Sequence, residues 1–242
     1  MSAIQIQNLT KRYRDVVAVD HLSLAVEQGE LMALLGVNGA GKTTTVKMLS
    51  CLTEPTEGDA YLLGRSIREE AAAIKARIGV SPQETAVAPG LTVLENLELL
   101  CGVYGFSREK RQARIGELSK QLGLDGILGR KAGKLSGGWQ RRLSIAMALI
   151  GEPEILFLDE PTLGLDVIAR SELWDLIRSL KGRVTVILTT HYMEEAEALS
   201  DRVAIMKDGR LLVCDTAAAI KAQTGADRFE DAFIAIVKGV RP

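Results

Sequence analysis

The stretch GVNGAGKTT, residues 36–44, decides the fold of this chain. It fits the pattern G-x-x-x-x-G-K-[ST], follows the apolar run LMALL and leads into the helical stretch KTTTVKMLSCL. Lys42 is expected to reach the β- and γ-phosphates of a nucleotide, and the Thr43 hydroxyl to ligate Mg²⁺. Three glycines let the backbone wrap closely and turn its N–H groups toward phosphate oxygens: Gly36, Gly39 and Gly41. The stretch therefore predicts that a nucleoside triphosphate binds where a strand ends.

A second stretch, ILFLDEP at residues 155–161, has the pattern of a buried strand that ends in two carboxylates. Asp159, at the carboxyl end of the strand, is expected to hold the Mg²⁺ shell through water, close to the phosphate-binding loop. Because side chains alternate along a strand, we expect Glu160 on the other side, where it could polarise an attacking water. The alternative is a pair of solvated acids that merely end a strand, and the phosphate-binding loop argues against it.

Apolar segments alternate with helical patterns, which predicts an α/β fold with a largely parallel sheet and crossover helices. The first strands precede any helix and are expected to be antiparallel, and the KDG turn at residues 207–209 is expected to close a hairpin. From about residue 91 to 150 the pattern indicates only helices, at residues 92–104, 107–122 and 137–150, which predicts a helical insert. The expected strands are residues 4–9, 16–26, 31–35, 60–63, 78–81, 155–158, 184–188, 203–206 and 210–214.

Composition limits the classes of function. The chain has 242 residues, of which 47% are hydrophobic and 25% charged, as in an ordinary globular protein. Its formal net charge of -1 provides no basic field, so nucleic acid is not expected as a partner. No apolar run approaches the roughly 18 residues that span a bilayer. We therefore expect a cytosolic chain, or one that reaches a membrane through a partner.

Six motifs occur in the order found in the ATP-binding subunits of ABC transporters: GVNGAGKTT, the glutamine of VSPQE, LSGGWQRR, ILFLDEP, GLD and TTH. The chain resembles that family over nearly its whole length. The resemblance implies a P-loop NTPase core, with a RecA-like mixed sheet and an antiparallel N-terminal β-subdomain, and an all-helical insert. It implies one ATPase domain at residues 1–226, with the core at 1–85 and 151–226 and the helical subdomain at about 86–150. A short helical tail would follow at 227–242.

The resemblance also implies roles for single residues. Tyr13 would stack on adenine, unless it only packs. Gln83 would contact Mg²⁺ and the attacking water, and His191 would align Glu160 with the γ-phosphate. Asp166 would touch the partner subunit's site, and it can also cap the helix that follows. With ATP and Mg²⁺ as expected cofactors, the catalytic residues are Glu160, His191 and Gln83, and the metal-holding residues are Thr43, Gln83 and Asp159. The nucleotide is expected to contact Gly36, Asn38, Gly39, Ala40, Gly41, Lys42, Thr43 and Thr44.

The stretch LSGGWQRR, residues 135–142, places two glycines at the start of a helical stripe. Free N–H groups, the helix dipole and the Ser136 hydroxyl there favour an anion, although the chain already has a phosphate cradle. In the family, two ATPase domains pair head to tail, which implies that Ser136, Gly137 and Gly138 cap the γ-phosphate held by the other subunit. Trp139 departs from the family's common glutamine, and either packs in the insert or interface or shields the ribose.

The family resemblance implies partners as well. These are transmembrane permease subunits on separate chains and a second ATPase subunit, identical or related, so the chain would lie peripherally on the cytoplasmic face of the cell membrane. The run THYMEEAEALSDRVAIMKDGRLL, the non-glutamine residue after LSGG and the short tail resemble the drug, polysaccharide and ion exporter branch. The alternatives are an importer ATPase, a non-transport ABC ATPase acting on nucleic acid or the ribosome, and a catalytically dead regulatory partner. The tail is expected to form an amphipathic helix with apolar Phe229, Ala232, Phe233 and Ile236.

Overall fold

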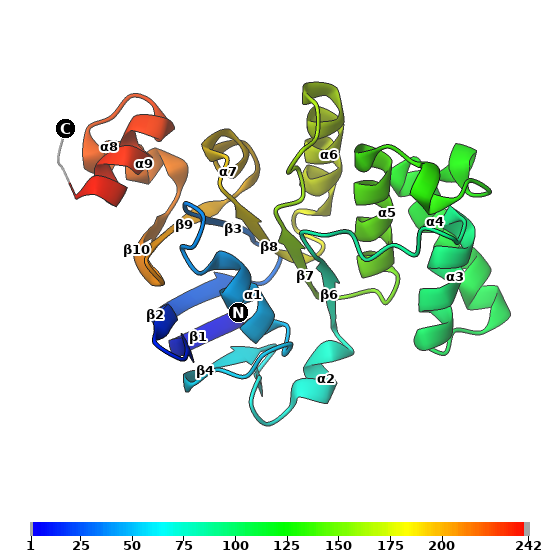
Figure 1. The fold of residues 1–242 in the computed structure, drawn as a ribbon, viewed down its shortest axis with the longest axis horizontal. Coiled ribbons are helices and arrows are strands. Elements are labelled where there is room, and N and C mark those ends of the chain that lie inside the picture. The colour runs from blue at the N-terminus through cyan, green and yellow to red at the C-terminus, as the bar shows by residue number, and fades with distance from the viewer. Residues whose placement is uncertain (1, 240–242) are drawn as a thin grey trace.

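The computed structural model describes residues 2–239, which form two β-sheets surrounded by helices (Figure 1). The larger sheet has six strands in the order β10-β9-β3-β8-β7-β6, all parallel except for the β9–β10 hairpin. That hairpin turns at Asp208 and Gly209, both with positive φ, as the KDG pattern predicts. The strands are β3 (Leu31–Leu35), β6 (Ile78–Ser81), β7 (Ile155–Asp159), β8 (Thr185–Thr190), β9 (Arg202–Lys207) and β10 (Arg210–Asp215).

The smaller sheet is antiparallel, with the strand order β2-β1-β4-β5. Its strands are β1 (Ser2–Tyr13), β2 (Val16–Glu27), β4 (Glu57–Leu62) and β5 (Arg65–Ser66). The expected antiparallel pairing of the first strands is confirmed for β1 and β2 but is wrong for residues 31–35. Those residues form β3, which pairs in parallel with β8 and β9. All five β3 side chains are buried, as in a central strand that is covered on both faces.

The helices are α1 (Lys42–Leu49), α2 (Ala71–Lys75), α3 (Val93–Val103), α4 (Arg108–Leu122), α5 (Gly137–Leu149), α6 (Val167–Leu180), α7 (Met193–Leu199), α8 (Ala217–Thr224) and α9 (Phe229–Lys238). The three expected helices between residues 91 and 150 are confirmed as α3, α4 and α5, which gather at one end of the molecule (Figure 1). Sequence reasoning missed α2 and β5, because elements of five and two residues are too short to show a period.

Alternation along the parallel strands produces two cores, one on each face of the larger sheet. In β7, Leu156 and Leu158 pack in the cluster that includes α3 to α6. Ile155 and Phe157 point the other way, into the cluster shared with α1 and the antiparallel sheet. Successive side chains of a strand face opposite sides, so one fully buried strand holds both cores together. The carboxyl end of this strand is where the predicted carboxylates lie.

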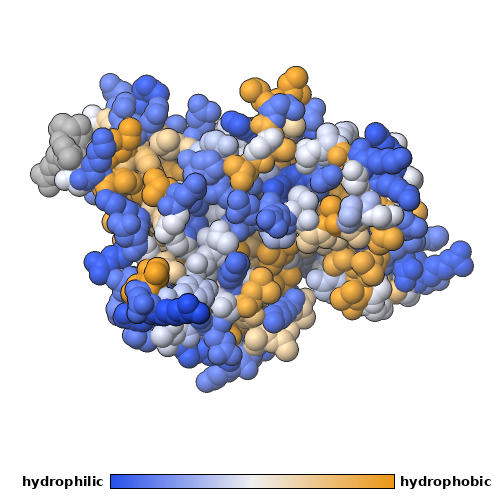
Figure 2. All heavy atoms as spheres, viewed as in Figure 1, coloured by the Kyte–Doolittle hydropathy of each residue, from blue (hydrophilic) through white to orange (hydrophobic). Residues whose placement is uncertain are grey.

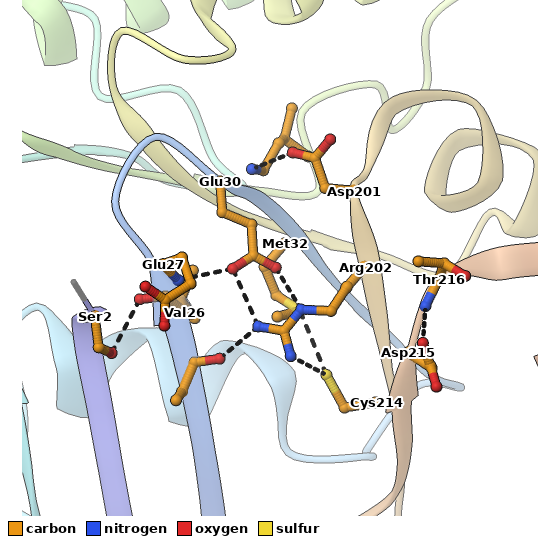
Figure 3. A network of polar contacts seen from close by, with 12 residues as sticks. Ser2, Val26, Glu27, Glu30, Met32, Asp201, Arg202, Cys214, Asp215 and Thr216 are labelled. Atoms are coloured by element: carbon orange, nitrogen blue, oxygen red, sulfur yellow. Dashed lines mark hydrogen bonds and ion pairs between the residues drawn. The ribbon is translucent and has the colours of Figure 1, made fainter. Parts of the chain in front are cut away.

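A partly buried ion pair joins the two sheets where β2 turns into β3 (Figure 3). Arg202, at the start of β9, donates from Nε and Nη2 to the Glu30 carboxylate at 2.7 and 3.0 Å. The same guanidinium donates to the Ala25 carbonyl of β2 at 2.7 Å, and Glu30 accepts from the Glu27 amide at 2.7 Å. A planar, bidentate guanidinium contact fixes orientation as well as distance. The ion pair therefore fixes the position of the antiparallel sheet relative to the parallel one.

The tail helix α9 packs onto its own domain, where it buries Phe229, Ala232 and Phe233 in a cluster with α7, α8 and β9. The expected tail at residues 227–242 is thus seen to residue 239. Met1 and residues 240–242, which belong to the expected domain and tail, lie outside the described residues. Among residues 2–239, every helix is too short or too polar to cross a bilayer.

Candidate nucleotide site

The phosphate-binding loop lies between β3 and α1, as the sequence predicts. Gly41, directly before α1, has φ 97°, a left-handed conformation that residues with a side chain rarely adopt. A Cβ there would also lie 2.4 Å from the Ala18 carbonyl oxygen of β2. The glycine therefore lets the loop pass close to β2.

Lys42 is the first residue of α1, and its side chain is buried although it carries a charge. Its Nζ donates to the Gly36 and Val37 carbonyl oxygens at 2.7 and 3.3 Å, and lies 3.5 Å from Glu160 Oε1. A buried ammonium with mostly neutral acceptors has capacity for a stronger anionic partner. The structure thus places the Lys42 ammonium against the loop carbonyls and close to Glu160.

Asp159, the last residue of β7, connects the strand to α1. Its Oδ1 accepts from the Thr43 hydroxyl at 3.2 Å and from the Thr189 hydroxyl of β8. Hydroxyl and carboxylate oxygens are the hard donors that suit Mg²⁺, so this pair fits the expected metal. Sequence reasoning missed Thr189. Its signal was the strand-end TTH, which the parallel pairing of β7 and β8 brings beside Asp159.

Glu160 does not lie on the opposite side from Asp159, so that expectation is wrong. The residue follows the end of β7 and has φ 49°, which breaks the alternation of the strand. Its amide donates to the Thr189 carbonyl and hydroxyl, at 3.1 and 3.0 Å. Its carboxylate thereby turns toward Lys42, and its Oε2 lies 2.7 Å from His191 Nδ1, within hydrogen-bond distance. Both carboxylates consequently face the start of α1.

Lys42, Thr43 and Glu160 line an open pocket of about 620 Å³, whereas Asp159 and the expected contact Gly36 are not among its lining residues. His191 and Glu160 meet the phosphate-binding loop there, and Gln83 enters from the connection after β6. Tyr13 is not a lining residue. It lies at the end of β1, 45% exposed, with Lys11 Nζ 5.0 Å from its ring centre. The remaining lining residues are Val16, Val17, Ala18, Asn38, Gly39, Ala40, Gly41, Thr44 and Leu163.

The residues Ser136, Gly137 and Gly138 lie outside this pocket, at the exposed start of α5. Ser136 occupies the N-cap position, yet its hydroxyl makes no capping bond. A Cβ on Gly138 would lie 3.2 Å from the Ala169 Cβ, so α5 runs close against the start of α6. One chain therefore brings the cradle residues together but leaves the Ser-Gly-Gly turn apart from them.

Two residues close to Ser136, Gly137 and Gly138 make contacts within the same chain. Asp166 Oδ1 accepts from the Ala169 amide at 2.9 Å and caps α6, as the sequence suggested. Trp139 is half-buried and packs against the core of the helical region, with the Arg142 guanidinium 5.0 Å from its ring centre.

A buried acid behind His191 escaped the sequence reasoning. Glu195, on α7, is fully buried, and its Oε1 accepts from the Trp174 indole N–H at 3.1 Å. Burial raises the pKa of Glu195, which opposes ionisation, and the nearby Glu160 charge acts in the same direction. Nothing in the polar run HYMEEAEA distinguishes it from the run's two other acids, Glu194 and Glu197.

Comparison with known proteins agrees with this geometry. A family model described as "ABC transporter" matches residues 19–163. The chain is similar to the daunorubicin resistance ATP-binding protein DrrA3 of Streptomyces coeruleorubidus, at 43% identity over 95% of this chain and 73% of that protein. It is 41% identical to the Nod factor export ATP-binding protein I of Burkholderia orbicola (strain AU 1054), over 95% of this chain and 76% of the relative.

A solved structure resembles the chain as well. It is the dimeric post-hydrolysis state of the ATP-binding cassette MJ0796 bound to ADP and Pi, which superposes with a TM-score of 0.80 at 31% identity. The match covers 88% of this chain and 98% of that one. The mixed α/β fold with its antiparallel subdomain is thus the P-loop NTPase fold of ATP-binding cassettes, as expected.

Proposed function

This chain belongs to the ABC transporter family, and from that premise we propose that it binds and hydrolyses ATP to drive transport through separate membrane-spanning subunits. One observation carries the proposal. The Glu160 carboxylate sits between Lys42 Nζ and His191 Nδ1 at the floor of the pocket, at 3.5 and 2.7 Å. A carboxylate held by a cation and an imidazole beside a phosphate cradle is arranged to take a proton from an attacking water.

The residues divide the chemistry between them. Lys42 would leave the loop carbonyls for the β- and γ-phosphates, and Glu160 would accept the proton of the water that attacks the γ-phosphorus. His191 would hold that carboxylate and the γ-phosphate in line, and the products would be ADP and inorganic phosphate. Mg²⁺ would be held by Thr43, Asp159 and Gln83, and when bound it would neutralise charge on the phosphates. Tyr13, which lies at the end of β1 and outside the pocket lining, would stack on adenine.

The second half of the site would come from another subunit. Ser136, Gly137 and Gly138 form an exposed helix start, and Asp166 lies on the same side at the start of α6. Head-to-tail pairing would bring this turn onto the γ-phosphate in the partner's pocket. The dimeric state of the MJ0796 cassette supports such an assembly.

The membrane subunits would dock in an apolar groove of about 440 Å³ that runs from β6 to α3 and α5. In Figure 2, apolar side chains gather on this face of the molecule. Two residues of the connection after β6 serve the two sites, because Gln83 lines the nucleotide pocket and Ala86 lines the groove. Movement of this connection at the nucleotide pocket would therefore also shift its residues in the groove. The lining residues are Ser50, Leu52, Lys75, Ile78, Gly79, Val80, Ala86, Leu100, Tyr104, Ser144, Met147 and Ala148.

We place the ATPase domain at residues 1–226, with the helical subdomain at about 86–150 and a tail from 227. Export is favoured over import by the names of the relatives, which concern drug resistance and Nod factor export. The chain would then act at the cytoplasmic face of a membrane, as a homodimer or beside a related ATPase.

Purification from its own cells in mild detergent tests this proposal. We expect a polytopic membrane protein to accompany the chain in stoichiometric amount, and its identity to indicate the cargo. ATP hydrolysis that requires nucleic acid or ribosomes, with no membrane protein attached, would contradict the transport function and support a non-transport ATPase.

A further inference from the structure

A buried arginine ties the connection that carries Gln83 to the helix that follows Ser136. Arg141, on α5, is 5% exposed. Its Nη1 donates to the Pro82 carbonyl oxygen and its Nη2 to the Gln83 carbonyl oxygen, each at 2.7 Å. These two acceptors are neutral and consecutive, so the planar guanidinium holds the two peptide groups that flank the Cα of Gln83.

Burying the Arg141 guanidinium has an electrostatic cost. A buried guanidinium is destabilised unless strong partners replace its hydration. Burial accordingly lowers the pKa of Arg141, and the charges of Asp159 and Glu195 oppose that effect. The hydrogen bonds to the Pro82 and Gln83 carbonyl oxygens replace part of the hydration that the guanidinium loses.

The same face of α5 makes further contacts with β6. The Ser144 and Ser81 hydroxyls lie 2.8 Å apart, and both residues are buried. Gly79 passes so close to α5 that a Cβ would lie 2.2 Å from the Ala148 carbonyl oxygen. Arg141, Ser144 and Ala148 are spaced three and four residues apart, which places them in one row along the helix.

The far end of the connection is also anchored to the helical region. Asn96 of α3 is fully buried, and its Oδ1 accepts from the Ala88 amide at 2.8 Å. Its Nδ2 donates to the Ala88 and Thr92 carbonyls at 3.2 and 2.8 Å. The connection between residues 82 and 88 is thus held at both ends by helices of the helical region, with Gln83 at the end that Arg141 holds.

We propose that Arg141 is a positioning residue that couples Gln83 in one ATP site to Ser136 in the other. Arg141 lies five residues after Ser136, which is about 7.5 Å along the helix axis. A shift of the Gln83 backbone toward a bound nucleotide would pull on the guanidinium and turn the start of α5. The turn would move the Ser-Gly-Gly segment toward the γ-phosphate in the partner's pocket. The inference rests on the proposed ATPase function.

Steady-state kinetics of Arg141→Gln and Arg141→Lys test this role in the full chain. We expect Arg141→Gln to bind Mg-ATP within about twofold of the parent but to lose kcat by about 10- to 100-fold, since misplacement by 1 Å costs that much. Arg141→Lys reaches one carbonyl at a time, so its kcat should lie between those of the parent and Arg141→Gln.

Arg114→Gln is the matched control. Arg114 of α4 donates from Nη2 and Nε to the Leu149 and Ile150 carbonyls at 2.5 and 3.4 Å, the same chemistry at the far end of α5. We expect Arg114→Gln to lower Tm but to keep kcat within about twofold at a temperature where it is folded.

Several outcomes would overturn the inference. A kcat near the parental value in Arg141→Gln would do so, as would equal losses in Arg141→Gln and Arg114→Gln that follow their folded fractions. If Arg141→Gln does not fold, Arg141→Lys decides, because parental kcat in that variant contradicts the coupling and an intermediate kcat with unchanged ATP binding supports it. A parental chain without any ATP hydrolysis would contradict the proposed function and this inference together.

Discussion

Glycines stand at the starts of both α1 and α5, yet the chain completes only the first site. At α1, Lys42 is buried against loop carbonyls, and Thr43 is hydrogen-bonded to Asp159 of the neighbouring strand. At α5, Ser136 is exposed and its hydroxyl makes no capping bond. The first start is organised within one chain, whereas the second presents donors to whatever approaches from outside.

The other capped helices show that this difference is specific. Thr92, Ser107 and Thr216 each precede a helix, and each side-chain oxygen accepts from the amide three residues on. Among the serines and threonines at N-cap positions in residues 2–239, Ser136 is the exception. A free hydroxyl at a helix start is available to an anion, so the exception supports a phosphate partner held by another subunit.

Lys42→Ala removes the buried lysine at the start of α1, the half-site that one chain completes. Of the variants considered, it should have the largest effect. Removing the buried ammonium takes away the main counter-charge of the phosphates, so we expect ATP affinity to fall about 100-fold, or by about 3 kcal/mol. Lys47→Ala, an exposed lysine on the same helix, is the matched control and should bind ATP like the parent. Equilibrium binding of a fluorescent ATP analogue measures both. Normal affinity in Lys42→Ala would rule out the assigned cradle.

Glu195→Gln tests the buried carboxyl group of α7, which lies near Glu160 in the half-site that the chain completes. Because burial raises the folded-state pKa, the stability contributed by the protonated carboxyl is complete below about pH 4 and is lost as pH rises toward the folded-state pKa. Glutamine does not ionise and can still accept from Trp174. The variant should therefore match the parent near pH 4 and exceed its Tm by about 2–6 °C at pH 8.

Thermal melts across that pH range provide the measurement, with exposed Glu194→Gln as the control that should show no such trend. A Tm gain that is the same at pH 4 and pH 8 would mean that folding does not raise the pKa of Glu195.

Trp139→Gln tests the other half, at the start of α5, and should change stability without changing ATP hydrolysis. The indole packs on the helical core and under the Arg142 guanidinium, so its loss should lower Tm by about 2–6 °C. ATPase activity at a permissive temperature should stay parental, because packing and not ribose contact is the role that the structure favours. Trp139→Phe should recover much of the Tm. An activity loss without a Tm loss would favour shielding of the ribose instead.

Sequence patterns succeeded where the information is local. The loop before α1 is specified by glycines and a lysine within nine residues, and α3, α4 and α5 by their helical periods. Prediction failed where distant strands meet. Thr189 reaches Asp159 only because β7 and β8 pair in parallel, and Arg141 grips Gln83 from 58 residues away.

Local conformation produced the remaining errors. Glu160 departs from the alternation of side chains along β7 because its φ is positive. Its hydrogen bonds to Thr189 stabilise that conformation. For β3, the run of five apolar residues did not reveal whether the neighbouring strands are parallel or antiparallel, because that depends on the chain's later strands.

The central claim is that Ser136 completes an ATP site on a second subunit, and the mass of Glu160→Gln in solution tests it most directly. Without its base this variant should retain ATP, so light scattering with Mg-ATP should show twice the 26.2 kDa of one chain. Adding Ser136→Arg should return the mass to one chain while each chain still binds ATP, and adding Ser107→Ala should leave the dimer intact. A monomer at saturating ATP, or a dimer that tolerates Ser136→Arg, would contradict the account.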